Sequence, residues 1–189
     1  MNGRNFFEKY NKYIKLLVCI EKKLPQKYRK RKLEKIINKH GRIAMLKRYI
    51  LISTLAKKVG VNVAVFPGVY FEHIENLSIG NNVSIHQMCY IDAEGGIDIG
   101  NDVSIAHRTT ILSSNHSYSE HNVAIKYQKM IFNKTILENN IWIGCNCTIL
   151  AGIHIGEGCV IGANAVVTHP IDNNSVAVGN PAVVIKRRK

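Results

Sequence analysis

The chain has 189 residues and a mass of 21.2 kDa, which leaves room for about one domain. Hydrophobic residues make up 46% of it and charged residues 21%, which excludes a wholly disordered protein. The net charge is +13, and residues 1–58 hold 18 of the 26 Lys and Arg but only 3 of the 13 acids. Residues 59–189 are close to neutral, which excludes a nucleic-acid clamp with cations spread over its binding face.

Residues 1–58 show apolar side chains three and four positions apart, which is the period of a helix. Pro25 and Gly41 interrupt this pattern, so we expect two or three short, basic, amphipathic helices. Two interpretations stay open. The apolar stripe packs on the rest of the chain, or the region attaches the protein to an anionic membrane surface.

The expected location follows from two features that are absent. No apolar run in residues 1–58 is long enough for a membrane span, and the N-terminal residues lack the apolar region and small-residue cleavage site of a secretory signal. The five cysteines form no CxxC pair, so no disulfide framework is indicated. We therefore expect a cytoplasmic protein, peripheral at the inner face of the membrane if the second interpretation holds.

After residue 58 the apolar period changes to six, in two frames. The first frame holds Val59, Val65, Phe71, Ile79, Ile85, Ile91, Ile99, Ile105 and Ile111, and the second holds Ile131, Leu137, Ile143, Ile149, Ile155, Ile161 and Val167. A period of six fits a coil of three short strands, each pointing one aliphatic side chain at a narrow axis. Four positions later, a smaller buried site is expected at Val83, Cys89, Val103, Thr109, Cys147, Cys159 and Ala165. Residues 59–189 are thus expected to form an all-β solenoid, with three cysteines as core residues.

The repeat fails between Ile111 and Ile131, where we expect an extruded loop at about residues 112–130. Loops that interrupt a regular scaffold commonly carry function. This loop holds His116, and a neutral imidazole is a suitable base for a hydroxyl near pH 7. A base is usually oriented by a third group. In the repeat register Asp92 and Glu94 lie one coil away, about 4.8 Å along the stack, and Glu120 lies within the loop; Glu94 is the preferred orienting group.

Several segments together resemble the hexapeptide-repeat acyltransferases. They are Ile-Trp-Ile-Gly-Cys-Asn-Cys-Thr-Ile-Leu-Ala-Gly-Ile-His-Ile-Gly-Glu-Gly (141–158), residues 160–168, Val-Gly-Asn-Pro-Ala (178–182), residues 95–107 and Asn-His-Ser-Tyr (115–118). The likeness is strongest to sugar and polysaccharide O-acetyltransferases, among them the galactoside and maltose acetyltransferases, and covers roughly residues 59–186. It implies a left-handed parallel β-helix, a homotrimer with active sites between neighbouring subunits, and acetyl-CoA as co-substrate with no bound cofactor or metal. The implied activity is acetylation of a sugar hydroxyl, in the biosynthesis of a surface polysaccharide such as capsule or lipopolysaccharide.

The resemblance also implies roles for single residues. His116 falls on the family's catalytic histidine, and we assign it as general base in direct transfer, with Glu94 as its partner. His86, Asp92 and Tyr118 are the candidate contacts of the sugar or glycan acceptor. The acetyl-CoA candidates are Trp142, Cys145, Gly162, Ala163, Thr168 and Lys186. Outward apolar residues, for which Phe66, Tyr90 and Ile141 are the candidates, would be buried between the three subunits.

Other function classes remain as alternatives. The γ-class carbonic anhydrases share the fold and bind zinc through three histidines, two of them spaced as His116 and His121 are, and His86 or His107 would supply the third. Within the acyltransferases, the alternative is acetylation of serine or of a xenobiotic antibiotic. A noncatalytic oligomeric scaffold would leave the loop histidine unexplained.

Overall fold

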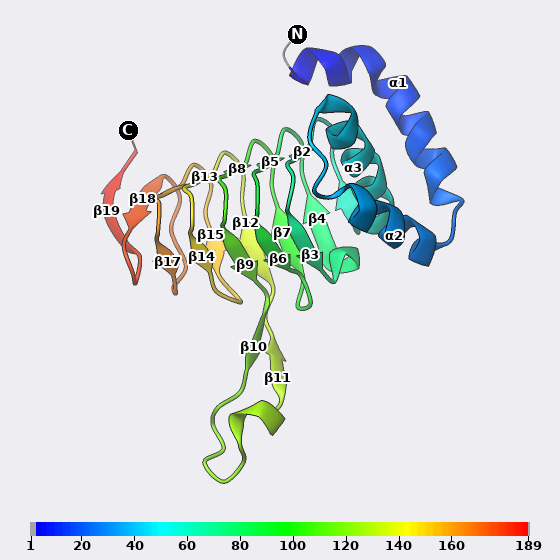
Figure 1. Cartoon of the computed structure of the whole chain (residues 1–189). Coiled ribbons are helices and arrows are strands. Elements are labelled where there is room, and N and C mark those ends of the chain that lie inside the picture. The colour runs from blue at the N-terminus through cyan, green and yellow to red at the C-terminus, as the bar shows by residue number, and fades with distance from the viewer. Residues whose placement is uncertain (1–2, 189) are drawn as a thin grey trace.

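The computed structural model describes residues 3–188, in which three helices precede a long stack of short strands (Figure 1). The helices are α1 (Gly3–Lys22), α2 (Gln26–Ile36) and α3 (Arg42–Leu55), as the interrupted helical pattern of the sequence predicts. The first strand begins at Lys58. No helix in the described range combines the length and the apolar character needed to cross a bilayer.

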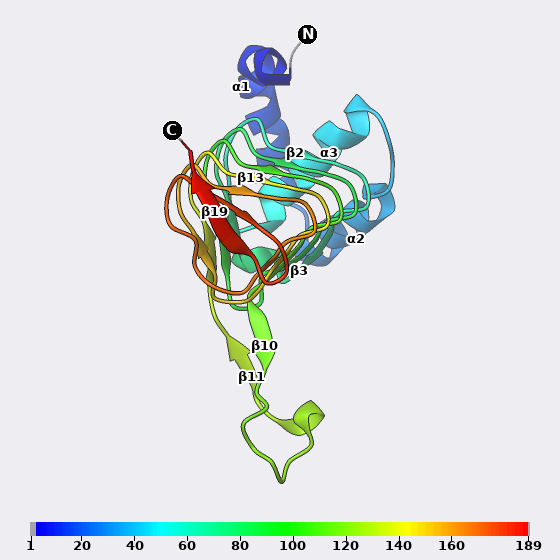
Figure 2. The same ribbon diagram turned by 90° about the vertical axis from the view of Figure 1, so that its left-hand side faces the viewer.

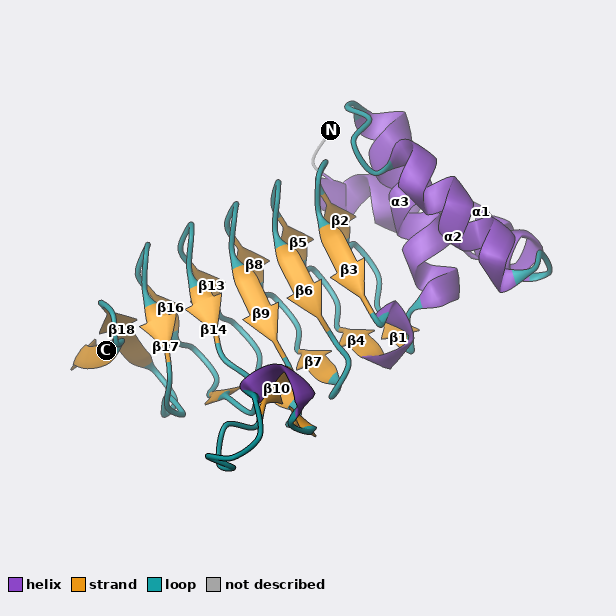
Figure 3. Ribbon diagram, turned by 60° about the horizontal axis from the view of Figure 1, so that its bottom comes forward, coloured by secondary structure: helices purple, strands orange, loops and turns teal. Residues whose placement is uncertain are grey.

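The strands form three parallel sheets that run along the stack, because each coil adds one strand to each sheet (Figure 3). Sheet 1 contains β1 (Lys58–Val59), β4 (Leu77–Ile79), β7 (Ile97–Ile99), β12 (Thr135–Leu137) and β15 (His154–Ile155). Sheet 2 contains β2 (Ala64–Val65), β5 (Ser84–Ile85), β8 (Ser104–Ile105), β13 (Trp142–Ile143), β16 (Val160–Ile161), β18 (Ser175–Val178) and the antiparallel edge strand β19 (Val183–Arg187). Sheet 3 contains β3 (Tyr70–Glu72), β6 (Tyr90–Asp92), β9 (Thr110–Leu112), β14 (Thr148–Ile149) and β17 (Val166–Val167). The predicted parallel β-solenoid with a helical N-terminal region is confirmed.

The six-residue pattern predicts the core well. Its aliphatic side chains from Ile79 to Ile111 and from Leu137 to Val167 are at most 3% exposed, as are the smaller residues four positions later. At the first coil, Val59 and Phe71 are only partly buried. Two assignments are wrong: Ile131 is 44% exposed because it lies on a hairpin outside the coil, and Ile141, expected to face outward, is 2% exposed.

Helix α3 covers the open end of the solenoid beside β2. In the stack, backbone N–H groups of each coil donate to carbonyls of the next coil along the chain. No coil precedes the first one, so its corresponding carbonyls have no backbone donor of this kind. Arg48, which is 1% exposed, donates from Nε to the Val65 carbonyl at 2.8 Å. The Tyr49 hydroxyl donates to the Gly60 carbonyl at 3.0 Å. The helix therefore replaces the missing coil with side-chain donors.

A hairpin leaves the solenoid between β9 and β12 (Figure 2). Its antiparallel strands are β10 (Ser114–His116) and β11 (Met130–Phe132), and a short 3-10 helix, η2 (Ile125–Tyr127), lies near its tip. The Gln128 side chain is 7% exposed and donates to the carbonyls of Glu120 and Val123, both at 2.8 Å. The tip is thus an ordered lobe with its own hydrogen bonds.

Candidate active site

His116 lies at the end of β10, opposite Met130 in the hairpin. Its side chain is exposed, and among the described residues the imidazole has no hydrogen-bond partner. Tyr118 follows it toward the tip and is 74% exposed. The hairpin projects away from the solenoid in two perpendicular views (Figures 1 and 2), so this part of the chain lies outside the stack of coils.

Asp92 and Glu94 lie where β6 leaves sheet 3, at the edge from which the hairpin also departs. In a single chain, the imidazole that faces both carboxylates is that of His73: its Nδ1 lies 3.6 Å from Asp92 Oδ1 and its Nε2 lies 3.8 Å from Glu94 Oε1. Asp92 is held in place, because its Oδ1 accepts from the Glu94 backbone N–H at 3.1 Å and its Oδ2 from the Ser114 hydroxyl at 2.5 Å. The orientation of His116 by Glu94 stays a prediction.

His73 is a site residue that the sequence analysis did not single out. The signal was available, because β3 and β6 pair Glu72 with Asp92, which places the residue after Glu72 at the same corner one coil away. Its backbone is left-handed, with φ of 49°, an uncommon conformation for a residue other than glycine. One ligand atom each from His73, Asp92 and Glu94 lies within 4.8 Å of the others, so the group can share a proton or hydrogen-bond a hydroxyl.

The histidines of the zinc alternative are arranged differently. His116 and His121 join no group of three metal-ligating side chains in the part of one chain that the structure describes. His86 stacks on Phe66, with ring centroids 4.6 Å apart and planes 8° from parallel. Burial lowers the pKa of His86, and the nearby charge of His107 lowers it further. His86 is therefore neutral near pH 7 and can both donate to and accept from a hydroxyl.

Two of the residues assigned to the donor lie in one row across sheet 2. The register pairs Trp142 with Val160, Val160 with Val176, and Val176 with Lys186. Neighbouring strands are about 4.8 Å apart, so this row spans roughly 15 Å. Trp142 is 58% exposed at one end, and at the other end Lys186 and the two arginines that follow it line a hollow of about 550 Å³. The row is an open surface with an aromatic ring and a cationic end.

The other donor residues lie at the turns beside this row. Cys145 is half-buried on the turn after β13. The next coil packs closely there, because a Cβ on Gly144 would lie 2.5 Å from the Ala163 backbone nitrogen. The Gly162 N–H donates a hydrogen bond to the Ala177 carbonyl of the next coil at 2.8 Å. The Thr168 hydroxyl forms a hydrogen bond with His169 Nδ1 at 2.9 Å.

The three core cysteines are poor nucleophiles. Burial raises the pKa of the Cys89 thiol to about 11, and burial also raises the pKa of Cys147 and Cys159. A thiolate is the reactive form, so these groups stay protonated and inert. Cys145, the one cysteine among the assigned donor residues, is only half-buried and does not belong to the solenoid core.

One chain does not bring the predicted base and the donor surface together. Figures 1 and 2 show β13 and the hairpin on opposite sides of the solenoid. The structure therefore separates the candidate residues into two sets. The first is the edge with His73, Asp92 and Glu94, from which the hairpin departs, and the second is the row from Trp142 to Lys186.

Comparisons with known proteins agree with this fold. Residues 134–169 match the family "Bacterial transferase hexapeptide (six repeats)". The galactoside O-acetyltransferase of Escherichia coli K12 is 34% identical over 140 residues, which are 74% of this chain and 68% of that protein. A maltose O-acetyltransferase structure from Clostridium difficile 630 superposes with a TM-score of 0.76 at 29% identity, over 87% of this chain and 86% of that one. A Vibrio cholerae hexapeptide-repeat acetyltransferase complexed with acetyl coenzyme A superposes with a TM-score of 0.77 at 26% identity, over 87% of each chain.

Proposed function

This chain belongs to the hexapeptide-repeat sugar acetyltransferase family, and from that premise we propose that it transfers the acetyl group of acetyl-CoA to a hydroxyl of a glycan in surface polysaccharide biosynthesis. The observation that carries the proposal is the open row from Trp142 to Lys186 on sheet 2. A cationic end suits the phosphates of the nucleotide, and an extended surface suits the pantetheine arm. The relative from Vibrio cholerae, with its acetyl coenzyme A, supports this donor.

The proposed reaction is a direct transfer. The acceptor oxygen attacks the thioester carbonyl carbon while His116 removes its proton, so a C–O bond forms as the proton moves to the imidazole. The C–S bond then breaks, and the leaving thiolate of CoA takes up the proton. The products are the O-acetyl sugar and free CoA, with no acetyl-enzyme. The exposed, unpartnered imidazole on the hairpin supports this role, because both of its nitrogens are accessible.

The active site is proposed to lie between neighbouring copies of the chain in a homotrimer. The hairpin carries His116 away from its own sheet 2, so the base of one copy has to meet the donor row of another. Closed cyclic symmetry repeats this contact at each interface without leaving a free end. Phe66, which lies on the outside of the coils, is an apolar group that such a contact would cover.

The helical region supports a position at an anionic membrane that carries the acceptor. Four apolar side chains of α1 recur at helical spacing and are 45% to 68% exposed: Tyr13, Leu16, Leu17 and Ile20. Exposed lysines, among them Lys12 and Lys15, flank this stripe. A basic helix with an exposed apolar face lies in the plane of a lipid surface, with its cations near the headgroups.

The test is an acetyl-transfer assay with the full-length protein. Release of CoA thiol from acetyl-CoA is followed over a panel of sugars and oligosaccharides, and the product ester is identified by NMR. We expect thiol release that depends on a sugar. His116→Ala should lower turnover by on the order of a hundredfold or more while the acetyl-CoA affinity stays unchanged.

His121→Ala is the matched control, because His121 is an exposed histidine on the same hairpin. A direct-transfer enzyme should tolerate this change. Equal loss in both variants, together with loss on chelation of metal, would support the zinc alternative and refute the proposed base. Thiol release with serine or a xenobiotic, but with no sugar, would refute the proposed acceptor class.

A further inference from the structure

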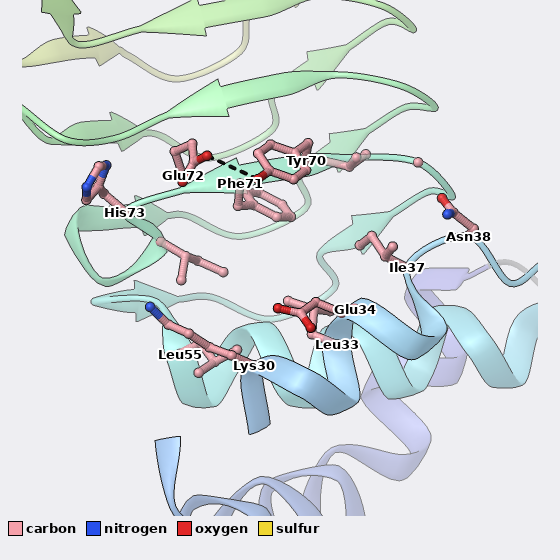
Figure 4. A pocket seen from close by; sticks show the side chains of 13 residues that line it. Lys30, Leu33, Glu34, Ile37, Asn38, Leu55, Tyr70, Phe71, Glu72 and His73 are labelled. Atoms are coloured by element: carbon pink, nitrogen blue, oxygen red, sulfur yellow. Dashed lines mark hydrogen bonds between the residues drawn. The ribbon is translucent and has the colours of Figure 1, made fainter. Parts of the chain in front are cut away.

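A cavity of about 450 Å³ lies between α2 and the first coil of the solenoid (Figure 4). Its size is typical of a small-molecule pocket. Apolar side chains from both elements line it, including Leu33 and Ile37 of α2 and Phe71 of β3. None of the residues assigned to the acceptor or donor from the sequence lines it, but His73 does, and the same His73 faces Asp92 and Glu94. The cavity therefore opens onto the candidate site along one edge of the solenoid.

The polar groups of the cavity include two carboxylates, from Glu34 and Glu72. Figure 4 shows Glu34 on α2 and Glu72 on β3, with Tyr70 beside Glu72. The Tyr70 hydroxyl donates to Glu72 Oε1 at 3.1 Å. This hydrogen bond raises the pKa of Tyr70, and the charges of Glu72 and Glu34 raise it further. Lys30, which also lines the cavity, is paired with Glu75 at 3.3 Å.

These charges determine which ligands fit. Two carboxylates that line one cavity, Glu34 and Glu72, accept hydrogen bonds from hydroxyl groups and repel phosphate or carboxylate groups. These carboxylates stand beside a helical region that is otherwise strongly basic, because residues 1–58 hold 18 of the 26 Lys and Arg. The cavity thus suits a ligand that is rich in hydroxyl donors and carries no negative charge.

Two stacked tyrosines lie at the cavity, one of which, Tyr70, lines it. Tyr70 and Tyr90, from consecutive coils of sheet 3, stack with ring centroids 5.6 Å apart and planes 8° from parallel. Both side chains are exposed, Tyr70 by 55%. The apolar C–H face of a pyranose ring packs on such a surface while its hydroxyls bond to the carboxylates.

We propose that this cavity binds an uncharged hexose unit of the acceptor, next to the unit that is acetylated. The inference rests on the proposed function, because it takes the acceptor to be a sugar. The edge from His73 through Asp92 to Ser114 connects the cavity with the base of the hairpin, so one extended ligand reaches both. The acceptor is then an oligosaccharide or glycan with at least two units, and α2 contributes to its recognition through Glu34.

The test measures sugar binding alone, by ligand-detected NMR on the full-length protein without acetyl-CoA. The probes are uncharged methyl hexosides and disaccharides, compared with hexuronic acids and hexose 6-phosphates. We expect the uncharged probes to bind, disaccharides more tightly, and the anionic probes to fail. Glu34→Gln should weaken binding on the order of tenfold, because it removes a charged acceptor. Glu157→Gln, a change at an exposed carboxylate several coils away, should leave binding unchanged.

A second variant reverses the charge. Glu34→Lys should lose the uncharged probes and gain the anionic ones, an exchange that a merely unfolded variant would not show. Binding of uncharged sugars that survives Glu34→Gln and Tyr70→Ala, or an absence of sugar binding in a protein that acetylates sugars, would overturn the inference. Glu34-dependent sugar binding without any acetyl transfer would support it and refute the proposed function, so the two failures are distinguishable.

Discussion

Arg48 provides the sharpest test of how the helical region is joined to the solenoid. Its guanidinium is buried, and it donates to the Val65 carbonyl at 2.8 Å, to Ile36 at 3.2 Å and to Lys39 at 2.6 Å. It therefore links the first coil to the end of α2. We consider the substitution Arg48→Met, which keeps most of the volume and removes the donors.

The expected loss follows from the three carbonyls. Val65 is fully buried, so its carbonyl is left without a donor at a cost of about 1–3 kcal/mol. The other two carbonyls, of Ile36 at the end of α2 and of Lys39 just after it, belong to less buried residues, where water replaces the guanidinium at a small cost. Removal of a buried cation returns part of this energy, because burial already lowers the pKa of Arg48 by disfavouring its charged form. The net loss is about 2 kcal/mol.

Thermal unfolding followed by circular dichroism measures this loss at one protein concentration. A loss of about 2 kcal/mol lowers the melting temperature by roughly 4–8 °C in a chain of this length. Arg42→Met is the matched control, since Arg42 lies exposed on the same helix and should change stability by less than about 0.5 kcal/mol. If both variants melt within about 1 °C of the wild-type protein, the helix does not cap the solenoid in the way that we describe.

The remaining predictions concern the catalytic route, the assembly and the membrane. Cys145→Ala should remain active, with at most weaker donor binding, because direct transfer needs no thiol; a dead variant that no longer traps labelled acetyl would indicate a covalent route. Light scattering should give about three times the chain mass of 21.2 kDa, and a fully active monomer would contradict the composite site. Binding to vesicles rich in phosphatidylglycerol should weaken as salt rises and should be lost in a Leu17→Glu/Ile20→Glu variant, but not in Val184→Glu, which changes an exposed apolar residue on β19. Equal binding by both variants would show that the apolar stripe of α1 does not contact lipid.

The period of six predicts the core because each coil repeats one geometry. A side chain such as Ile85 or Ile149 has the same surroundings as its counterparts above and below, so the pattern alone places it inside. Ile131 matches the pattern by chance, and only its partner strand shows that it belongs to the hairpin. Ile141 lies one residue before β13, at the same place in its coil as the buried Val83 and Val103, so its side chain also points inward.

The candidate site is harder to predict from sequence because its contacts join separate coils and different elements. The register of sheet 3 places Asp92 and Glu94 at the edge, but the imidazole that faces them comes from His73 on the coil below. The cavity beside them depends on how α2 packs against β3, and no repeat pattern relates Glu34 to Tyr70. Long-range packing between a helix and a solenoid end leaves no periodic trace in the sequence.

The hairpin is an insertion between two coils, and the hydrogen bonds that join those coils are the same as elsewhere in the stack. The Asn81 N–H donates to the Asn101 side chain across a step of 20 residues, and the Asn101 N–H donates to Asn139 across 38, both at 2.8 Å. The same contact thus closes over 18 additional residues. Because the entropy of closing a loop grows slowly with its length, this segment is free to lengthen, shorten or change its sequence at little cost to the fold. Insertions, deletions and substitutions in the hairpin beyond His116 are therefore compatible with an unchanged solenoid.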